Sequence, residues 1–157
     1  MSLDAPQHLP VNGTDFHIGI VAARFNGALV DALVAKACAW LYANGVEPAA
    51  IETVRVPGSH EVPWAAQQLA ASGRFDAVIT LGVLIAGDTN HHEMVGDAVA
   101  NALMRVSLDT RIPVINGVIV VNTLEQAEAR ATGPINRGVE FATAALEMAA
   151  LKKKLSQ

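Results

Sequence analysis

A polar segment that directly follows a long apolar run carries a dense set of groups able to do chemistry. Residues 86–93 read AGDTNHHE. Gly87 lets backbone N–H groups approach a ligand closely, and these amides could cradle an anion together with the Thr89 hydroxyl at the start of a helix. His91 could transfer a proton near neutral pH. A plainer interpretation stays open, in which Asp88 or Thr89 only caps the helix and His91 is a solvated side chain.

The same segment does not have the spacing of a metal site. His91, His92 and Glu93 are consecutive, and consecutive residues of a helix point about 100° apart. No histidine stands four residues away on the same face, as it does in the zinc motif HExxH. We therefore expect no metal ion, and we expect His92 and Asp97 to be ordinary surface residues of the helix.

Two further segments that follow apolar runs could hold an organic ligand. Residues 56–63 read VPGSHEVP, and the Glu61 carboxylate there could accept hydrogen bonds from a neutral polyhydroxy compound. Glu61 could equally complement the positive end of its own helix. Phe25, in the segment AARFN at 22–26, could stack on a planar heterocycle, or it could serve as a core or lid residue.

Two arginines late in the chain are candidate phosphate ligands. Arg130 and Arg137 flank a Gly-Pro turn, and a planar guanidinium can form paired hydrogen bonds with a phosphate. The alternative is that both are surface charges at helix ends.

Alternating strands and helices must position these segments. Apolar periodicity predicts strands at 17–22, 51–56, 76–85 and 113–121, and helices at 26–44, 61–71, 91–108, 123–130 and 137–155. The runs at 76–85 and 113–121 are apolar throughout, which is typical of parallel strands buried on both faces. The run at 51–56 alternates apolar and polar residues, which indicates a strand nearer the sheet edge.

This order of elements predicts an α/β fold, a three-layer α/β/α sandwich around a four-stranded parallel sheet. Only such a sheet, with right-handed crossovers and helices on both faces, accommodates the alternation in one domain. Ligands bind to such sheets beyond the carboxyl ends of the strands, where the strand order reverses. We expect residues 16–157 to form this single domain and residues 1–15 to form a flexible N-terminal arm.

The composition restricts the class of protein and its partners. The chain has 157 residues, 52% hydrophobic and 17% charged, with a formal net charge of −4. It is therefore expected to be globular and not to bind nucleic acid. Cys38 is the only cysteine, which fits a reducing compartment, and we expect the cytoplasm. We expect no membrane span, because no apolar stretch approaches roughly 20 residues, and no secretory signal.

Taken together, five motifs make the sequence resemble the lumazine synthase family. They are ARFN at 23–26, VPGSHEVP at 56–63, GVLIAGDTNHHE at 82–93, the NGV and NTLEQA stretch at 116–127, and NRG at 136–138. The resemblance runs from about residue 16 to residue 150 and implies a flavodoxin-like sheet. It implies the condensation of 5-amino-6-(D-ribitylamino)uracil with 3,4-dihydroxy-2-butanone 4-phosphate, which releases phosphate and water in the penultimate step of riboflavin biosynthesis. It implies no cofactor.

The resemblance also implies a role for each matching residue. His91 matches the proton-transfer histidine of the family. The pyrimidine and its ribityl chain would contact Phe25, Ser59, His60, Glu61 and the backbone of Leu84 and Ile85, and the phosphate would contact Gly87, Asp88, Thr89 and Arg130. Asn116 and Arg137 would come from a neighbouring subunit and close the pocket.

Pockets shared between subunits imply a homo-oligomer. The family builds on pentamers, which some members stack into decamers or close into icosahedral shells. The apolar faces of an Ala-rich chain also favour association over a monomer. Riboflavin synthase is a further expected partner.

The sequence departs from the family pattern at three places. Ala86 stands where the family usually has arginine, and His60 stands where many members have an apolar or aromatic residue. The stretch ATGPIN at 131–136 is one residue shorter than in many shell-forming members and lacks their lysine. These departures keep open a low-turnover paralogue that acts as a lumazine- or flavin-binding carrier or assembly protein. A flavodoxin-like signalling or FMN-binding module is a second alternative, although the first loop is not glycine-rich.

Overall fold

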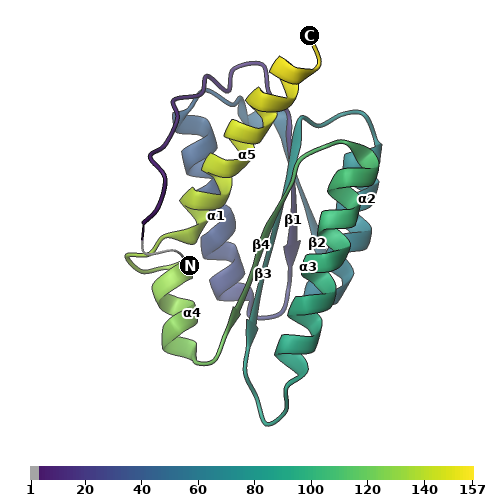
Figure 1. Ribbon diagram of the computed structural model, residues 1–157. Helices are drawn as coiled ribbons and strands as arrows, with labels where there is room; N and C mark the ends of the chain where they lie inside the picture. Colours follow the sequence, from purple (N-terminus) through teal and green to yellow (C-terminus); the bar gives the residue numbers. More distant parts are fainter. Residues whose placement is uncertain (1–3) are drawn as a thin grey trace.

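The computed structural model describes residues 4–157, and within this range four strands and five α-helices follow one another (Figure 1). The strands are β1 (Ile18–Ala23), β2 (Ile51–Val56), β3 (Ala77–Ile85) and β4 (Val114–Val121). The α-helices are α1 (Gly27–Ala43), α2 (Val62–Ala71), α3 (His91–Thr110), α4 (Leu124–Ala131) and α5 (Arg137–Leu155). Each predicted strand and helix is confirmed to within two residues. Two short 3-10 helices, η1 (Pro48–Ala50) and η2 (Ser59–Glu61), were not predicted.

The four strands form one parallel sheet in the order β2-β1-β3-β4. β1 and β3 lie in the middle, and every residue of β1 is buried. Successive side chains of a strand point to opposite faces of the sheet. Accordingly, Ile18 and Ile20 belong to the apolar core on one face, and Val21 and Ala23 belong to the core on the other.

Helices cover both faces of this sheet, as Figure 1 shows. On one face α1, α4 and α5 pack through buried residues such as Leu33 and Phe141. On the other face α2 and α3 pack through residues such as Leu69 and Leu103. The predicted three-layer α/β/α sandwich is therefore confirmed.

The prediction holds for one of the two outer strands and fails for the other. β2 is an edge strand, as its alternating pattern indicated. The prediction that residues 113–121 form a strand buried on both faces is wrong, because Asn116 and Val120 are exposed and other residues of β4 are only half-buried. β4 is the last strand in the order, so it has one neighbouring strand only. A hollow between α3, β4 and α5 also leaves Ile115 incompletely covered.

The segment before the sheet lies against the helices of one face. Residues 4–15 contain no helix or strand. The backbone N–H of Leu9 donates a hydrogen bond to Glu147 Oε1 at 3.1 Å, and the His8 ring lies 6.1 Å from the Trp40 ring. The segment is thus attached to α1 and α5, while residues 1–3 of the predicted arm lie outside the described residues. In the described part of the chain, no helix is long and apolar enough to cross a membrane.

Candidate active site

A cavity of about 460 Å³ opens where β1 and β3 end. These strands are neighbours, but the chain continues from β1 to β2 on one side and from β3 to β4 on the other. The loops that follow the two strands separate at this point, which is where parallel sheets of this kind bind ligands. The volume is typical of small-molecule sites. The cavity therefore lies where the strand order predicted it.

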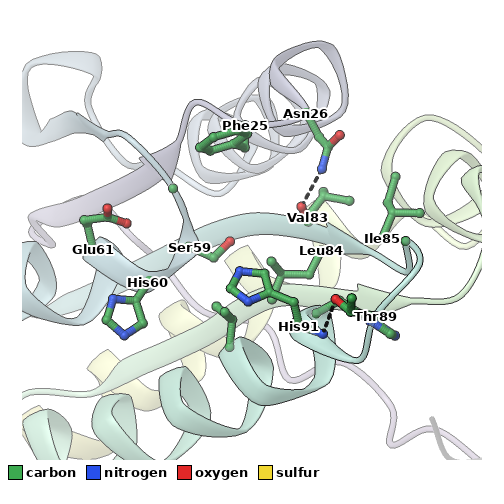
Figure 2. A pocket seen from close by; sticks show the side chains of 14 residues that line it. Phe25, Asn26, Ser59, His60, Glu61, Val83, Leu84, Ile85, Thr89 and His91 are labelled. Atoms are coloured by element: carbon green, nitrogen blue, oxygen red, sulfur yellow. Dashed lines mark hydrogen bonds between the residues drawn. The ribbon is translucent and has the colours of Figure 1, made fainter.

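Phe25 and Asn26 form the wall that follows β1. Asn26 has a left-handed backbone conformation with φ 54° directly before α1. Its side-chain amide donates a hydrogen bond to the carbonyl oxygen of Val83 at 2.7 Å, which ties the start of α1 to β3. Phe25 is 72% exposed, so its ring is available to stack on a ligand. Figure 2 shows Phe25 and His91 on opposite sides of the opening.

The second wall is η2, whose three residues all line the cavity. A Cβ atom on Gly58 would lie 3.1 Å from Phe25 Cδ2 and 3.4 Å from Glu61 Oε2. The absence of a side chain there lets the Phe25 ring and the Glu61 carboxylate approach the same point. Ser59 is buried, and a Cβ atom on Gly82 would lie 2.5 Å from its Oγ. The 3-10 helix η2 is therefore seated directly on β3.

The end of β3 and the start of α3 form the third wall. Leu84 and Ile85 are half-buried at the end of the strand, and Gly87 and Thr89 line the cavity from the turn that follows. Thr89 Oγ1 accepts a hydrogen bond from the backbone N–H of His91 at 3.3 Å. The His91 imidazole points into the cavity in Figure 2. Since α3 begins here, the positive end of its dipole faces the same space.

The polar groups of the cavity differ in their chemistry. Among the described residues that line it, Glu61 is the only acid, and His60, His91 and His92 are the titratable bases. An exposed aromatic ring, a carboxylate and the start of a helix suit a polar heterocycle together with an anionic group. Within residues 4–157, no group of three or more His, Cys, Asp and Glu side chains is arranged to hold a metal ion.

Two predicted residues from the strand ends do not line this cavity. Asp88 is exposed in the turn before α3 but lies outside the lining. Asn116 is exposed on β4, where its Oδ1 accepts a hydrogen bond from the backbone N–H of Val118 at 3.1 Å. It borders the hollow between α3, β4 and α5 instead.

The two predicted arginines also lie outside the cavity of their own chain. Arg130 is on α4, and its Nη1 donates a hydrogen bond to the carbonyl oxygen of Gln126 at 3.0 Å. Arg137 begins α5, where its Nε lies 2.9 Å from Glu140 Oε2 and its guanidinium carbon lies 4.9 Å from the centre of the Phe141 ring. A single chain therefore brings together ten of the thirteen predicted site residues. Nine line the cavity, namely Phe25, Ser59, His60, Glu61, Leu84, Ile85, Gly87, Thr89 and His91, and Asp88 lies in the same turn as Gly87 and Thr89.

The prediction that His92 is an ordinary surface residue is wrong. Its side chain is only 9% exposed, and it lines the cavity. His92 precedes Val95 by three residues and Val99 by seven, so it belongs to the buried face of α3, and this spacing was the signal available in the sequence. Asp97 is exposed, as predicted. Four other lining residues were not predicted as site residues: Asn26, Gly58, Val83 and Val95.

Comparisons with known proteins show the family of the chain. The family model of 6,7-dimethyl-8-ribityllumazine synthase matches residues 15–153. The 6,7-dimethyl-8-ribityllumazine synthase of Stenotrophomonas maltophilia (strain K279a) is 49% identical over 137 residues, which are 87% of this chain and 88% of the relative. That of Xanthomonas euvesicatoria pv. vesicatoria (strain 85-10) is 47% identical over 143 residues, 90% of this chain and 93% of the relative. That of Xylella fastidiosa (strain M12) is 47% identical over 137 residues, 87% of this chain and 89% of the relative. The chain therefore belongs to the 6,7-dimethyl-8-ribityllumazine synthase family, whose members are transferases of riboflavin biosynthesis.

Proposed function

We propose that the cavity binds 5-amino-6-(D-ribitylamino)uracil and 3,4-dihydroxy-2-butanone 4-phosphate and condenses them to 6,7-dimethyl-8-ribityllumazine. One observation carries this proposal: an exposed aromatic ring, a carboxylate and an imidazole face a single cavity of about 460 Å³. These groups match three needs of the reaction. The ring stacks on a pyrimidine, the carboxylate accepts hydrogen bonds from hydroxyl groups, and the imidazole carries protons.

The pyrimidine substrate is assigned to the wall formed by α1 and η2. Phe25 stacks on its ring, and the backbone of Leu84 and Ile85 meets its polar edge. The ribityl chain lies along η2, where Ser59, His60 and Glu61 can hydrogen-bond its hydroxyl groups. The exposure of Phe25 and Glu61 to the cavity supports this assignment.

The phosphate is assigned to the turn at residues 87–89. Gly87 and Thr89 line the cavity next to the first turn of α3, and a helix N-terminus favours an anion. Asp88 contributes through its backbone, because its carboxylate would repel the phosphate. The Thr89 hydroxyl adds a donor.

The proposed reaction needs several proton transfers. The uracil 5-amine attacks the ketone and forms an imine with loss of water, and phosphate then leaves by elimination. The ribitylamino nitrogen closes the second ring with loss of a second water. His91 is assigned as the general acid and base, which is worth about 10²–10⁴-fold in rate. Holding two substrates together in one cavity supplies the rest of the acceleration.

We assign three further residues to the site of a neighbouring subunit in a homo-oligomer built on pentamers. Asn116, Arg130 and Arg137 all lie outside the cavity of their own chain. The edge at β4 is flanked by exposed apolar side chains of α3, including Met104 and Leu108, and an exposed apolar surface is typical of an interface. In this assembly Arg130 holds the phosphate, and Asn116 and Arg137 close the pocket.

The proposal includes a cytoplasmic location and riboflavin synthase as a partner. The single cysteine, Cys38, supports a reducing compartment. Riboflavin synthase would take up the lumazine that this enzyme makes.

The deciding experiment measures the lumazine absorbance formed when the purified protein is mixed with both substrates. The rate is corrected for the spontaneous reaction, and Arg130→Ala is measured beside it. Clear acceleration that is lost in Arg130→Ala is the expected result. No acceleration, combined with tight binding of a ribityl-pyrimidine product analogue, would contradict the proposal and favour a carrier.

A further inference from the structure

The loop that carries Phe25 is attached to the segments on both sides of it. On the side of β2, the backbone N–H of Phe25 donates a hydrogen bond to the carbonyl oxygen of Pro57 at 3.3 Å. On the side of β3, the side-chain amide of Asn26 donates a hydrogen bond to the carbonyl oxygen of Val83 at 2.7 Å, which Figure 2 shows as a dashed line. Phe25 therefore lies between an attachment made by its own backbone and one made by the side chain of the next residue.

The bond from Asn26 continues the contact between two strands past the point where their pairing ends. β1 and β3 pair as far as Ala22 and Leu81. Beyond this pair, β3 continues along β4 as far as Ile85. Val83 lies in this continuation, so the Asn26 amide connects the loop after β1 to a part of β3 that β1 itself no longer reaches.

Asn26 also supplies the backbone conformation of the loop. Its φ of 54° and ψ of 46° lie in the left-handed region, directly before the first residue of α1. This region is uncommon for residues other than glycine, and asparagine is among the side chains that tolerate it best. Glycine would adopt the same conformation, but it has no side chain to donate a hydrogen bond. Asparagine thus combines the turn from β1 into α1 with the bond to β3.

We infer that Asn26 is a positioning residue for Phe25, whose ring it holds at the place where the pyrimidine stacks. This inference rests on the proposed function of the cavity. The Phe25 side chain is 72% exposed, so its packing contacts are few and its place depends on the backbone of its loop. The bond to Val83 fixes that backbone relative to the adjacent Leu84, whose backbone meets the edge of the pyrimidine in our proposal. The groups that contact the face and the edge of the substrate ring are then in place before the substrate binds.

The first test is a steady-state kinetic analysis of Asn26→Gly and Asn26→Asp in the assembled enzyme. Asn26→Gly keeps the left-handed conformation and removes the donor. The KM for the pyrimidine substrate should rise roughly tenfold, the effect of losing one hydrogen bond, and the KM for 3,4-dihydroxy-2-butanone 4-phosphate should not change. Asn26→Asp should raise the KM for the pyrimidine further, because a carboxylate cannot donate and repels the Val83 carbonyl oxygen.

The matched control is Asn101→Asp, which should change neither KM. Asn101 is exposed on α3, outside the cavity lining, and its side-chain amide also donates to a backbone carbonyl oxygen, that of Asp97 at 2.9 Å. The inference is overturned if the Asn26 variants raise both KM values together, or if they lower the thermal unfolding temperature and leave both KM values unchanged.

A second test asks whether Asn26 acts through Phe25. The dissociation constant of 6,7-dimethyl-8-ribityllumazine is measured for the wild type, Asn26→Gly, Phe25→Leu and the double variant. Asn26→Gly should weaken binding when Phe25 is present and change it little once Phe25 is replaced, because two residues that act as a unit do not have additive effects. An equal loss in both backgrounds would show that Asn26 acts independently of the ring and would overturn the inference.

A third test needs neither turnover nor a ligand. Crystal structures of the wild type and of Asn26→Asp, both without substrate, are compared at Phe25, with Asn26→Gly in place of Asn26→Asp if the latter does not fold. The ring should be displaced or lose its defined position in the variant, and an unchanged ring would contradict the inference. A wild-type protein that does not accelerate the reaction would instead contradict the proposed function, and the comparison of Phe25 would still decide the role of Asn26.

Discussion

His91 and His92 show how one turn of helix gives two identical side chains different environments. Consecutive residues of a helix point about 100° apart. His91 therefore faces the cavity and solvent, while His92 faces the packed side of α3. A proton carrier must exchange protons with water and substrate, and only the first environment allows this readily. The exposed histidine is therefore the one assigned to proton transfer.

His91→Ala is predicted to lower the turnover number without abolishing turnover. The expected loss is roughly 10²–10⁴-fold, the usual contribution of a general acid–base group, and the remaining rate reflects the binding of both substrates in one site. The measurement is the corrected rate of lumazine formation, with His17→Ala as the matched control. Full wild-type activity in His91→Ala would rule out the assigned role.

The position of η2 depends on a close contact between two elements. Ser59 is buried against β3, and the contact requires that position 82 carries no side chain. Glycine at this point of β3 weakens the strand itself, but it allows another backbone to approach. The segment that holds the ribityl chain in our proposal is thus placed by a residue of a different element.

Gly82→Ala is predicted to destabilise the protein and to impair binding of the pyrimidine. The added Cβ would lie 2.5 Å from Ser59 Oγ, so η2 must shift. The free energy of unfolding should fall by about 1–3 kcal/mol, as is typical of overpacking, and the KM for the pyrimidine should rise. Chemical denaturation and kinetics measure both effects. Gly27→Ala is the control for stability, because nothing lies within 4 Å of a Cβ there; equal unfolding curves for both variants would contradict the prediction.

On α1, the surroundings of Cys38 shift the pKa of its thiol. Burial raises the pKa of the Cys38 thiol, and a hydrogen bond with the Tyr42 side chain, one turn later, partly opposes this shift. Since the thiolate is the reactive form, a raised pKa means that less thiolate is present at a given pH. Cys38 should therefore react slowly with thiol reagents when the protein is folded.

Alkylation of Cys38 by iodoacetamide should show this shift directly. The pH at which the rate reaches half of its maximum should be higher in the folded protein than in the protein unfolded in denaturant. Tyr42→Phe removes the hydrogen bond that lowers the pKa, so it should move the midpoint higher still. A folded-state midpoint at or below that of the unfolded chain would be inconsistent with burial as the dominant cause.

At the scale of the whole molecule, the described chain leaves apolar surface uncovered along β4. The hollow between α3, β4 and α5 continues into a second hollow nearer the C-terminal end of α5, and both are bordered by Leu108 and Met148. Leu108 is 70% exposed. A continuous apolar surface beside an edge strand favours association with other subunits. In our proposal, the same association completes the active site.

Mixed assemblies of two impaired variants should recover activity. His91→Ala damages the part of the site that one chain supplies, and Arg137→Ala damages the part assigned to its neighbour. If both are produced together, some sites combine an intact His91 with an intact Arg137, so the mixture should be more active than either variant alone. Light scattering should give a mass that is a multiple of 16.4 kDa for the wild type and the mixture. A monomeric mass, or no recovery in the mixture, would refute the shared site.

The sequence by itself determined the order and type of the elements, the three-layer fold and most of the residues around the cavity. These features depend on local periodicity and on segments that follow strands, which can be read along the chain. Only the tertiary structure decided that β4 lies at an edge, that His92 is buried, and that Arg130 lies outside the cavity of its own chain. An apolar run has the same pattern whether one or two strands flank it, and a histidine has no fixed preference for the surface. Burial and proximity result from contacts between distant segments, so they are determined when the elements pack together.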